Sequence, residues 1–187
     1  MSRPSSKELF RFAAIYLATA FLFSFLSFLH MQPPVVIAEY ARPALIFEIG
    51  GHIVFGLLAA IPFLDLELII LTGLLCILID IDHFQIALGF QLSGNPDHSI
   101  FFALVSALVL ASVSPPRLKI ELFAAGFVVL FAHVAFDVFA GWNLFQLLIP
   151  LNFKVFTLPK TSWFTLELGA ITIAIAATLL TRRLRNS

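Results

Sequence analysis

Long apolar stretches follow one another along the chain, separated by short segments that carry most of its prolines and charges. A helix needs roughly 20 apolar residues to cross the hydrocarbon core of a bilayer. The pattern predicts six transmembrane helices, over residues 9–29, 44–63, 66–81, 98–113, 120–140 and 163–180, of which the third and fourth are short. We therefore expect an all-α fold: a polytopic membrane helical bundle that forms one transmembrane domain over residues 1–187.

The composition supports a membrane environment. Of the 187 residues, 60% are hydrophobic and 12% are charged, whereas soluble domains are about half apolar and about a quarter charged. The formal net charge is zero, so the charge balance does not favour nucleic acid as a partner. Cys76 is the only cysteine, which excludes a disulfide framework and a cysteine metal cluster. The expected partner is the lipid bilayer, and the sequence carries no signal for an oligomeric state.

The distribution of lysine and arginine predicts the orientation, because cytoplasmic loops carry an excess of both. With a cytoplasmic amino terminus, the inner side collects Arg3, Lys7, Arg11, Arg117, Lys119, Arg182, Arg183 and Arg185. The outer side then collects only Arg42, Lys154 and Lys160. We therefore expect both termini inside.

The first apolar segment is longer than a signal-peptide core and no small-x-small cleavage site follows it, so we expect an uncleaved helix.

Ionisable residues interrupt these apolar segments. Each costs roughly 2.5–3.5 kcal/mol at the centre of a membrane helix, so such residues are functional candidates by default. They are Glu48 and His52 in the second segment, Asp80, Asp82 and His83 at the end of the third, Asp97 and His98 at the start of the fourth, and His133 and Asp137 in the fifth. The predicted orientation places all of them at one level, near the outer face.

Their spacing favours a metal site. His133 and Asp137 are four residues apart, as are Glu48 and His52, so each pair lies on one helix face. Two ligands one turn apart can hold a single ion. Asp82 does not share a face with Asp80 in a regular helix, so either the helix unwinds there or Asp82 orients a ligating histidine.

A bound cation would compensate for burying these groups. Several of them without partners would cost on the order of 10 kcal/mol together, which mutual hydrogen bonds offset in part and a divalent cation more fully. Histidine and carboxylate ligands without thiolates suit zinc, with manganese or iron as alternatives, and four converging segments have room for one or two ions. Alternatively, Asp97 follows a Gly94-Asn95-Pro96 turn and would simply cap the fourth helix.

Four patches of the chain resemble the YdjM-type family of inner-membrane proteins, described as membrane-bound metal-dependent hydrolases and distantly similar to zinc-dependent phospholipase C. The patches are Gly51-His52-Ile53-Val54-Phe55, Leu78-Ile79-Asp80-Ile81-Asp82-His83, Asp97-His98-Ser99, and Ala132-His133-Val134-Ala135-Phe136-Asp137 with its continuation to Leu151. The family-like core covers residues 44–160; helix 9–29 is extra and the last helix is 163–181. The resemblance implies an inner-membrane location and, as metal ligands or their neighbours, His52, Asp80, Asp82, His83, His98, His133 and Asp137.

The chain departs from this family at one motif. Ser93-Gly94-Asn95 stands where the family has His-Arg-Gly, so one histidine and one arginine are missing. That arginine would have been a phosphate clamp. Either Asp97 replaces the lost ligand, or this chain binds fewer metal ions or none.

The leading functional hypothesis is a hydrolase in which a metal-activated water attacks an ester or phosphoester. Asp97 or Glu48 would accept the proton and His98 would stabilise charge. The depth of the site suggests a lipid headgroup as substrate, with an interface lined by Trp142, Trp163, Lys154 and Lys160.

Two alternatives use the same residues. A transporter or proton-coupled carrier would carry an inverted repeat, which the sequence does not show. A non-catalytic membrane protein with a decayed metal site would explain the missing histidine and arginine.

Overall fold

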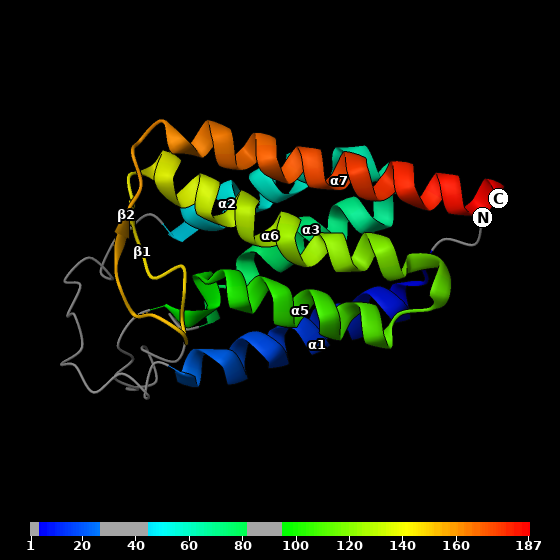
Figure 1. Ribbon diagram of the computed structural model, residues 1–187, viewed down its shortest axis with the longest axis horizontal. Coiled ribbons are helices and arrows are strands. Elements are labelled where there is room, and N and C mark those ends of the chain that lie inside the picture. Colours follow the sequence, from blue (N-terminus) through cyan, green and yellow to red (C-terminus); the bar gives the residue numbers. More distant parts are fainter. Residues whose placement is uncertain (1–3, 27–44, 82–94) are drawn as a thin grey trace.

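The computed structural model describes residues 4–26, 45–81 and 95–187 (Figure 1). Within these ranges it contains six α-helices: α1 (Ser6–Ser24), α2 (Leu45–Ala60), α3 (Leu66–Leu78), α5 (Ile100–Val113), α6 (Lys119–Ala140) and α7 (Ser162–Asn186). Successive helices run in opposite directions along the long axis (Figure 1). The prediction of an all-α fold is confirmed, and each described helix matches one of the six apolar segments.

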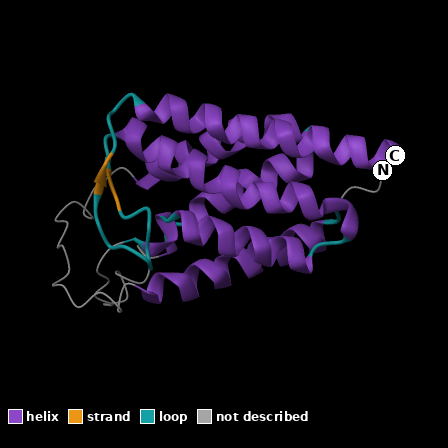
Figure 2. Cartoon of the chain, viewed as in Figure 1, coloured by secondary structure: helices purple, strands orange, loops and turns teal. Residues whose placement is uncertain are grey.

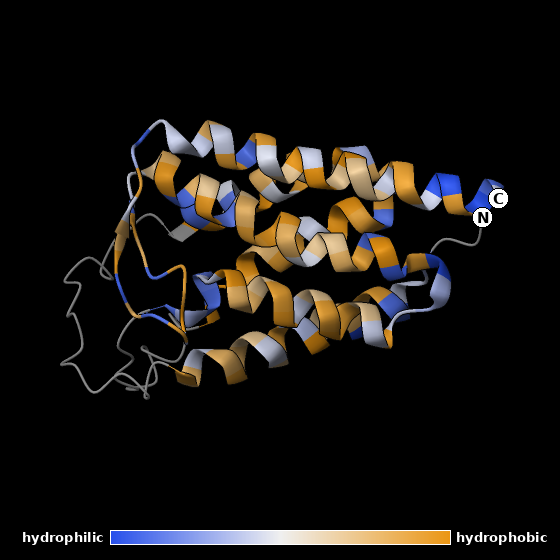
Figure 3. Cartoon of the chain, in the orientation of Figure 1, coloured by the Kyte–Doolittle hydropathy of each residue, from blue (hydrophilic) through white to orange (hydrophobic). Residues whose placement is uncertain are grey.

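Three of the helical segments are long and apolar enough to cross a membrane: Ile46–Phe63, Pro116–Ala140 and Ser162–Asn186. The apolar helices Leu66–Leu78 and Ile100–Val113 are shorter. Many large apolar side chains are exposed, including Ile46, which is 89% exposed, and Leu64, Leu168 and Leu179. Hydrophobic residues predominate along the helices (Figure 3). These features are consistent with a membrane protein, because a soluble monomer rarely exposes so much apolar surface. Six complete spans remain a prediction.

Local sequence sets the helix boundaries. The Ser5 hydroxyl accepts a hydrogen bond from the Glu8 N–H, and the Ser5 N–H donates to the Glu8 carboxylate at 2.8 Å, which is a capping box at the start of α1. That backbone N–H lowers the pKa of Glu8 below its ordinary value. The Asp65 side chain caps α3 by accepting from the Leu68 N–H at 3.1 Å. Pro115 and Pro116 separate α5 from α6.

Helix α6 is the centre of the bundle and packs against α2, α3, α5 and α7. Small residues allow this close approach. A Cβ added to Gly126 would lie 2.7 Å from the Ala107 backbone of α5. Likewise, a Cβ on Gly56 of α2 would lie 3.0 Å from the Gly73 Cα of α3, so this glycine lets α2 and α3 pack closely.

Helix α1 belongs to the same bundle and packs against α3 and α5. Phe12, Tyr16 and Ala20 are fully buried and four residues apart, so they form one face. The Tyr16 ring meets the Phe102 ring of α5 edge-on at 5.4 Å. The helix that was extra to the family resemblance is therefore part of the apolar core.

The segment between α6 and α7 forms a small hairpin that the sequence did not predict. Strand β1 (Leu144–Phe145) pairs antiparallel with β2 (Phe156–Thr157), and both lie at one end of the bundle (Figure 2). Gly141, with φ at +109°, ends α6 in the left-handed conformation that glycine adopts readily. At the opposite end of the bundle, α1 begins and α7 ends (Figure 1).

Candidate metal centre

Five ionisable side chains from four segments meet at the hairpin end of the bundle. His52 comes from α2, Asp80 from the turn after α3, His98 from the short helix η3 (Pro96–His98), and His133 and Asp137 from α6. Two groups of three, His52–Asp80–His133 and His98–His133–Asp137, each offer ligand atoms that lie within 4.8 Å of one another. The structure therefore brings together five of the predicted residues from four segments of the chain.

The two carboxylates face the Nε2 atoms of all three histidines. Asp80 lies 3.4 Å from His52, 3.7 Å from His98 and 3.4 Å from His133. Asp137 lies 3.5 Å from His52, 3.6 Å from His98 and 3.3 Å from His133. In each carboxylate one oxygen faces His52 and the other faces the remaining two rings. The arrangement encloses a single small volume between five donor side chains.

The histidine rings are held rigidly. His52, His98 and His133 are each at most 3% exposed. The His52 ring stacks on the His133 ring at 3.9 Å with an angle of 5°, and the His98 ring meets His133 at 72°. Such packing fixes the directions in which the ring nitrogens point.

The end of α3 sets the tautomer of His133. The Asp80 N–H bonds the Ile77 carbonyl at 3.2 Å, which tightens the last turn of α3. The His133 Nδ1 lies 2.7 Å from the Cys76 carbonyl. Because a carbonyl can only accept, Nδ1 of His133 carries a proton and donates it, and Nε2 of the neutral ring keeps its lone pair.

His98 has a corresponding arrangement. Its Nδ1 lies 3.3 Å from Oδ1 of Asp97, which is fully buried, so the carboxylate accepts a hydrogen bond from this nitrogen. The Nε2 of neutral His98 then also keeps its lone pair. That atom lies 2.9 Å from Nε2 of His133. Two lone pairs at this distance, beside two carboxylates, repel one another unless a cation lies between them.

The remaining predicted residues occupy different positions. Asp97 faces the His98 nitrogen that is turned away from the other donors, where it can orient the ring. Glu48 is half-buried one turn before His52 and belongs to neither group of three. Asp82 and His83 lie outside the described residues.

The predicted interface residues lie at the same end of the molecule. The Trp142 indole N–H donates to the Leu144 carbonyl, and Lys154 lies over the Phe156 ring at 5.8 Å. Trp163, at the start of α7, contacts the rings of Phe55 and Phe139. Lys160 is exposed in the segment before α7. None of them contributes to the two groups of possible ligands.

Two contacts of the centre were not predicted. The Cys76 carbonyl belongs to the backbone, so no residue type signals it. Phe136 meets the His52 ring edge-on at 4.6 Å, and a phenylalanine in an apolar helix carries no distinguishing signal.

No protein-family model, curated protein or solved structure matches this chain. The resemblance to the YdjM-type family therefore remains a prediction from the four motifs.

Proposed function

We propose that this chain is a membrane-embedded metal-dependent hydrolase whose ion is held by His52, Asp80, His98, His133 and Asp137. The observation that carries the proposal is the distance of 2.9 Å between Nε2 of His98 and Nε2 of His133, with two carboxylates around them. In neutral rings whose Nδ1 atoms donate to Asp97 and to the Cys76 carbonyl, both Nε2 atoms offer a lone pair. A divalent cation satisfies all of these groups at once. Neutral imidazole and carboxylate are donors that zinc prefers, with manganese and iron as alternatives.

The spacing of the donors supports such an ion. Metal–ligand distances of about 2.0–2.2 Å place neighbouring ligand atoms roughly 3.3–3.6 Å apart at tetrahedral angles and about 2.9 Å apart at right angles. The Nε2–carboxylate distances at His133 are 3.3 and 3.4 Å, and the two Nε2 atoms of His98 and His133 are 2.9 Å apart. The donor set therefore fits with little movement.

The same geometry favours one ion over two. Both groups of three include His133, whose Nδ1 donates to the Cys76 carbonyl. Its single free lone pair, on Nε2, can bind only one ion. We therefore expect one metal ion per chain, shared among the five residues.

The proposed reaction is hydrolysis of an ester or phosphoester in a lipid or interfacial substrate. A bound divalent ion would supply Lewis acidity and make water nucleophilic near neutral pH. Asp97 holds the His98 ring in place, and the packed rings of His52 and His133 keep the donor atoms preorganised. Glu48, one turn before His52, remains the candidate acceptor for the proton of the attacking water. The inner-membrane location and the outer-face level of the centre are parts of the same proposal.

Metal analysis of the detergent-purified chain tests the proposal. We expect about one zinc ion per chain, lost in His133→Ala because that residue belongs to both groups of ligands. Cys76→Ala is the matched control: it removes the only thiol and keeps the carbonyl that orients His133, so the metal should stay. No metal above background after loading with zinc, manganese or iron would refute the proposal.

A metal-free protein would point to a proton as the cation between His98 and His133. That outcome would favour the proton-coupled carrier. Metal bound without hydrolysis of phosphodiester or phospholipid substrates would instead favour a non-catalytic protein with a retained site.

A further inference from the structure

An apolar groove runs along the outer surface between α2 and α6, directly beside the candidate metal centre. Its walls include Phe47, Gly50, Gly51 and Val54 of α2 and Phe136 and Phe139 of α6. Its volume is about 400 Å³, within the range of roughly 300–1,000 Å³ that is typical of small-molecule sites. Every named wall is a hydrocarbon or a glycine, so the groove suits an apolar ligand.

The glycines shape this groove. A Cβ on Gly51 would overlap the Phe136 ring, so the ring lies directly against the α2 backbone. A Cβ on Gly50, by contrast, would meet no atom within 4 Å, so Gly50 borders open space. At Gly50 a ligand can therefore lie against the α2 backbone.

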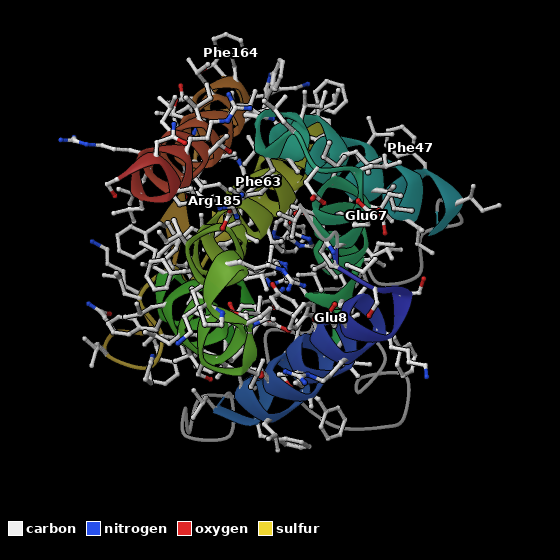
Figure 4. All side chains as sticks on the ribbon, turned by 90° about the vertical axis from the view of Figure 1, so that its right-hand side faces the viewer. Glu8, Phe47, Phe63, Glu67, Phe164 and Arg185 are labelled. Carbon is white, nitrogen blue, oxygen red and sulfur yellow. The ribbon has the colours of Figure 1, made fainter. Side chains whose placement is uncertain are left out.

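One side chain joins the groove to the centre. Phe136 lines the groove, and its ring also meets His52 edge-on at 4.6 Å. The neighbouring residue on α6, Asp137, is one of the five polar groups and is 16% exposed at its side chain. Phe47, whose ring centroid lies 5.7 Å from that of Phe136, is 57% exposed and lies at the periphery of the bundle (Figure 4).

We propose that this groove binds one hydrocarbon chain of the substrate lipid, with the polar ester or phosphoester end of that lipid at the His/Asp centre. The inference rests on the proposed function and adds its substrate class: a lipid recognised by its chain as well as by its headgroup. The groove and the His/Asp centre share the Phe136 ring, so an apolar surface directly adjoins a polar group, as the two halves of an amphipathic molecule require. Each methylene group of a bound hydrocarbon chain would bury apolar area in the groove, which a polar ligand would not do.

Photo-crosslinking tests this proposal without needing a metal. The probe is a phosphatidylglycerol with a diazirine in one acyl chain, added as a minor component to phosphatidylcholine nanodiscs that hold the full chain. We expect labels concentrated on the α2 and α6 residues of the groove in chelator-treated and in metal-loaded protein alike. Labels spread evenly over the exposed faces of α1, α5 and α7 would show annular lipid only and would overturn the proposal.

Filling the groove supplies the matched comparison. Gly50→Leu places a side chain in open space, and we expect roughly tenfold weaker groove labelling, as if about two methylenes lost their contacts. Ala18→Leu adds three carbon atoms, against four in Gly50→Leu, at an exposed position on α1 and should leave groove labelling unchanged. Zinc content of both variants reports folding. Unchanged groove labelling in Gly50→Leu would overturn the proposal that the groove binds a hydrocarbon chain. Groove labelling of a protein that binds no metal would support the groove as a lipid site and would refute the proposed hydrolase.

Discussion

At the residue scale, the centre depends on which nitrogen of each histidine carries the proton. His98 and His133 both have an acceptor at Nδ1, the Asp97 carboxylate and the Cys76 carbonyl. These acceptors turn both Nε2 atoms into donors to a cation. Partners of this kind commonly raise the affinity of a metal site about 10–100-fold.

Replacing Asp97 by asparagine should therefore weaken zinc binding by about one order of magnitude, because a neutral amide holds the His98 Nδ1–H less strongly than a carboxylate does. Competition with a chromogenic chelator in detergent measures the affinity. Asp65→Asn is the control, because Asp65 caps α3 outside the centre. Equal affinity in the Asp97 and Asp65 variants would contradict an orienting role for Asp97.

The sequence predicted the members of this centre better than their arrangement. His52, Asp80, His98, His133 and Asp137 were identifiable because charged groups are rare in apolar helices. Their shared level followed from alternating helix directions. The roles of Asp97 and of the Cys76 carbonyl were not predictable, because ring orientation depends on where α3 ends and on backbone atoms that every residue possesses.

At the element scale, α6 carries two of the five polar groups and touches four other helices. Its position is set by close contacts such as that between Gly126 and Ala107 of α5. The apolar segments predicted which residues form helices, with errors at the ends: the third was expected to end at 81 and ends at Leu78, and the last was expected to end at 180 and continues to Asn186. The short β1–β2 pairing escaped prediction because strands of two residues carry no periodic pattern.

Gly126→Ala should destabilise the bundle by about 1–3 kcal/mol, because the new methyl group forces α5 and α6 apart. Thermal unfolding in detergent measures the loss. Gly50→Ala is the matched control, since its Cβ enters open space and a helix gains about 0.5–1 kcal/mol from the same exchange. Equal stability of the two variants would show that the α5–α6 contact has room for a methyl group.

At the scale of the whole molecule, the two ends of the bundle differ in character. One end of the bundle, where α1 begins and α7 ends, carries two ion pairs. Arg117 lies 3.7 Å from Glu8, and Arg185 lies 3.4 Å from Glu121. Arg11 also donates to the Val113 carbonyl there. The opposite end carries the hairpin and the His/Asp centre. The lysine and arginine distribution predicts that the end with the ion pairs lies inside and the end with the His/Asp centre lies outside.

Cysteine labelling tests that orientation. In a Cys76→Ala background, Asn152→Cys should react with a membrane-impermeant maleimide added to intact cells, because the hairpin segment is expected outside. Ser187→Cys should react only after the membrane is permeabilised. The reverse result would place the centre at the cytoplasmic face and would overturn the predicted topology.

The contact between His133 and the Cys76 carbonyl has an evolutionary consequence. An acceptor supplied by the main chain cannot be removed by exchanging a side chain, so we expect position 76 to tolerate substitution by other small apolar residues. What must be inherited instead is the length of α3, since a single inserted or deleted residue would turn a different carbonyl toward the ring. Related chains should therefore vary in residue at this position yet keep a constant number of residues between Asp65 and Asp80.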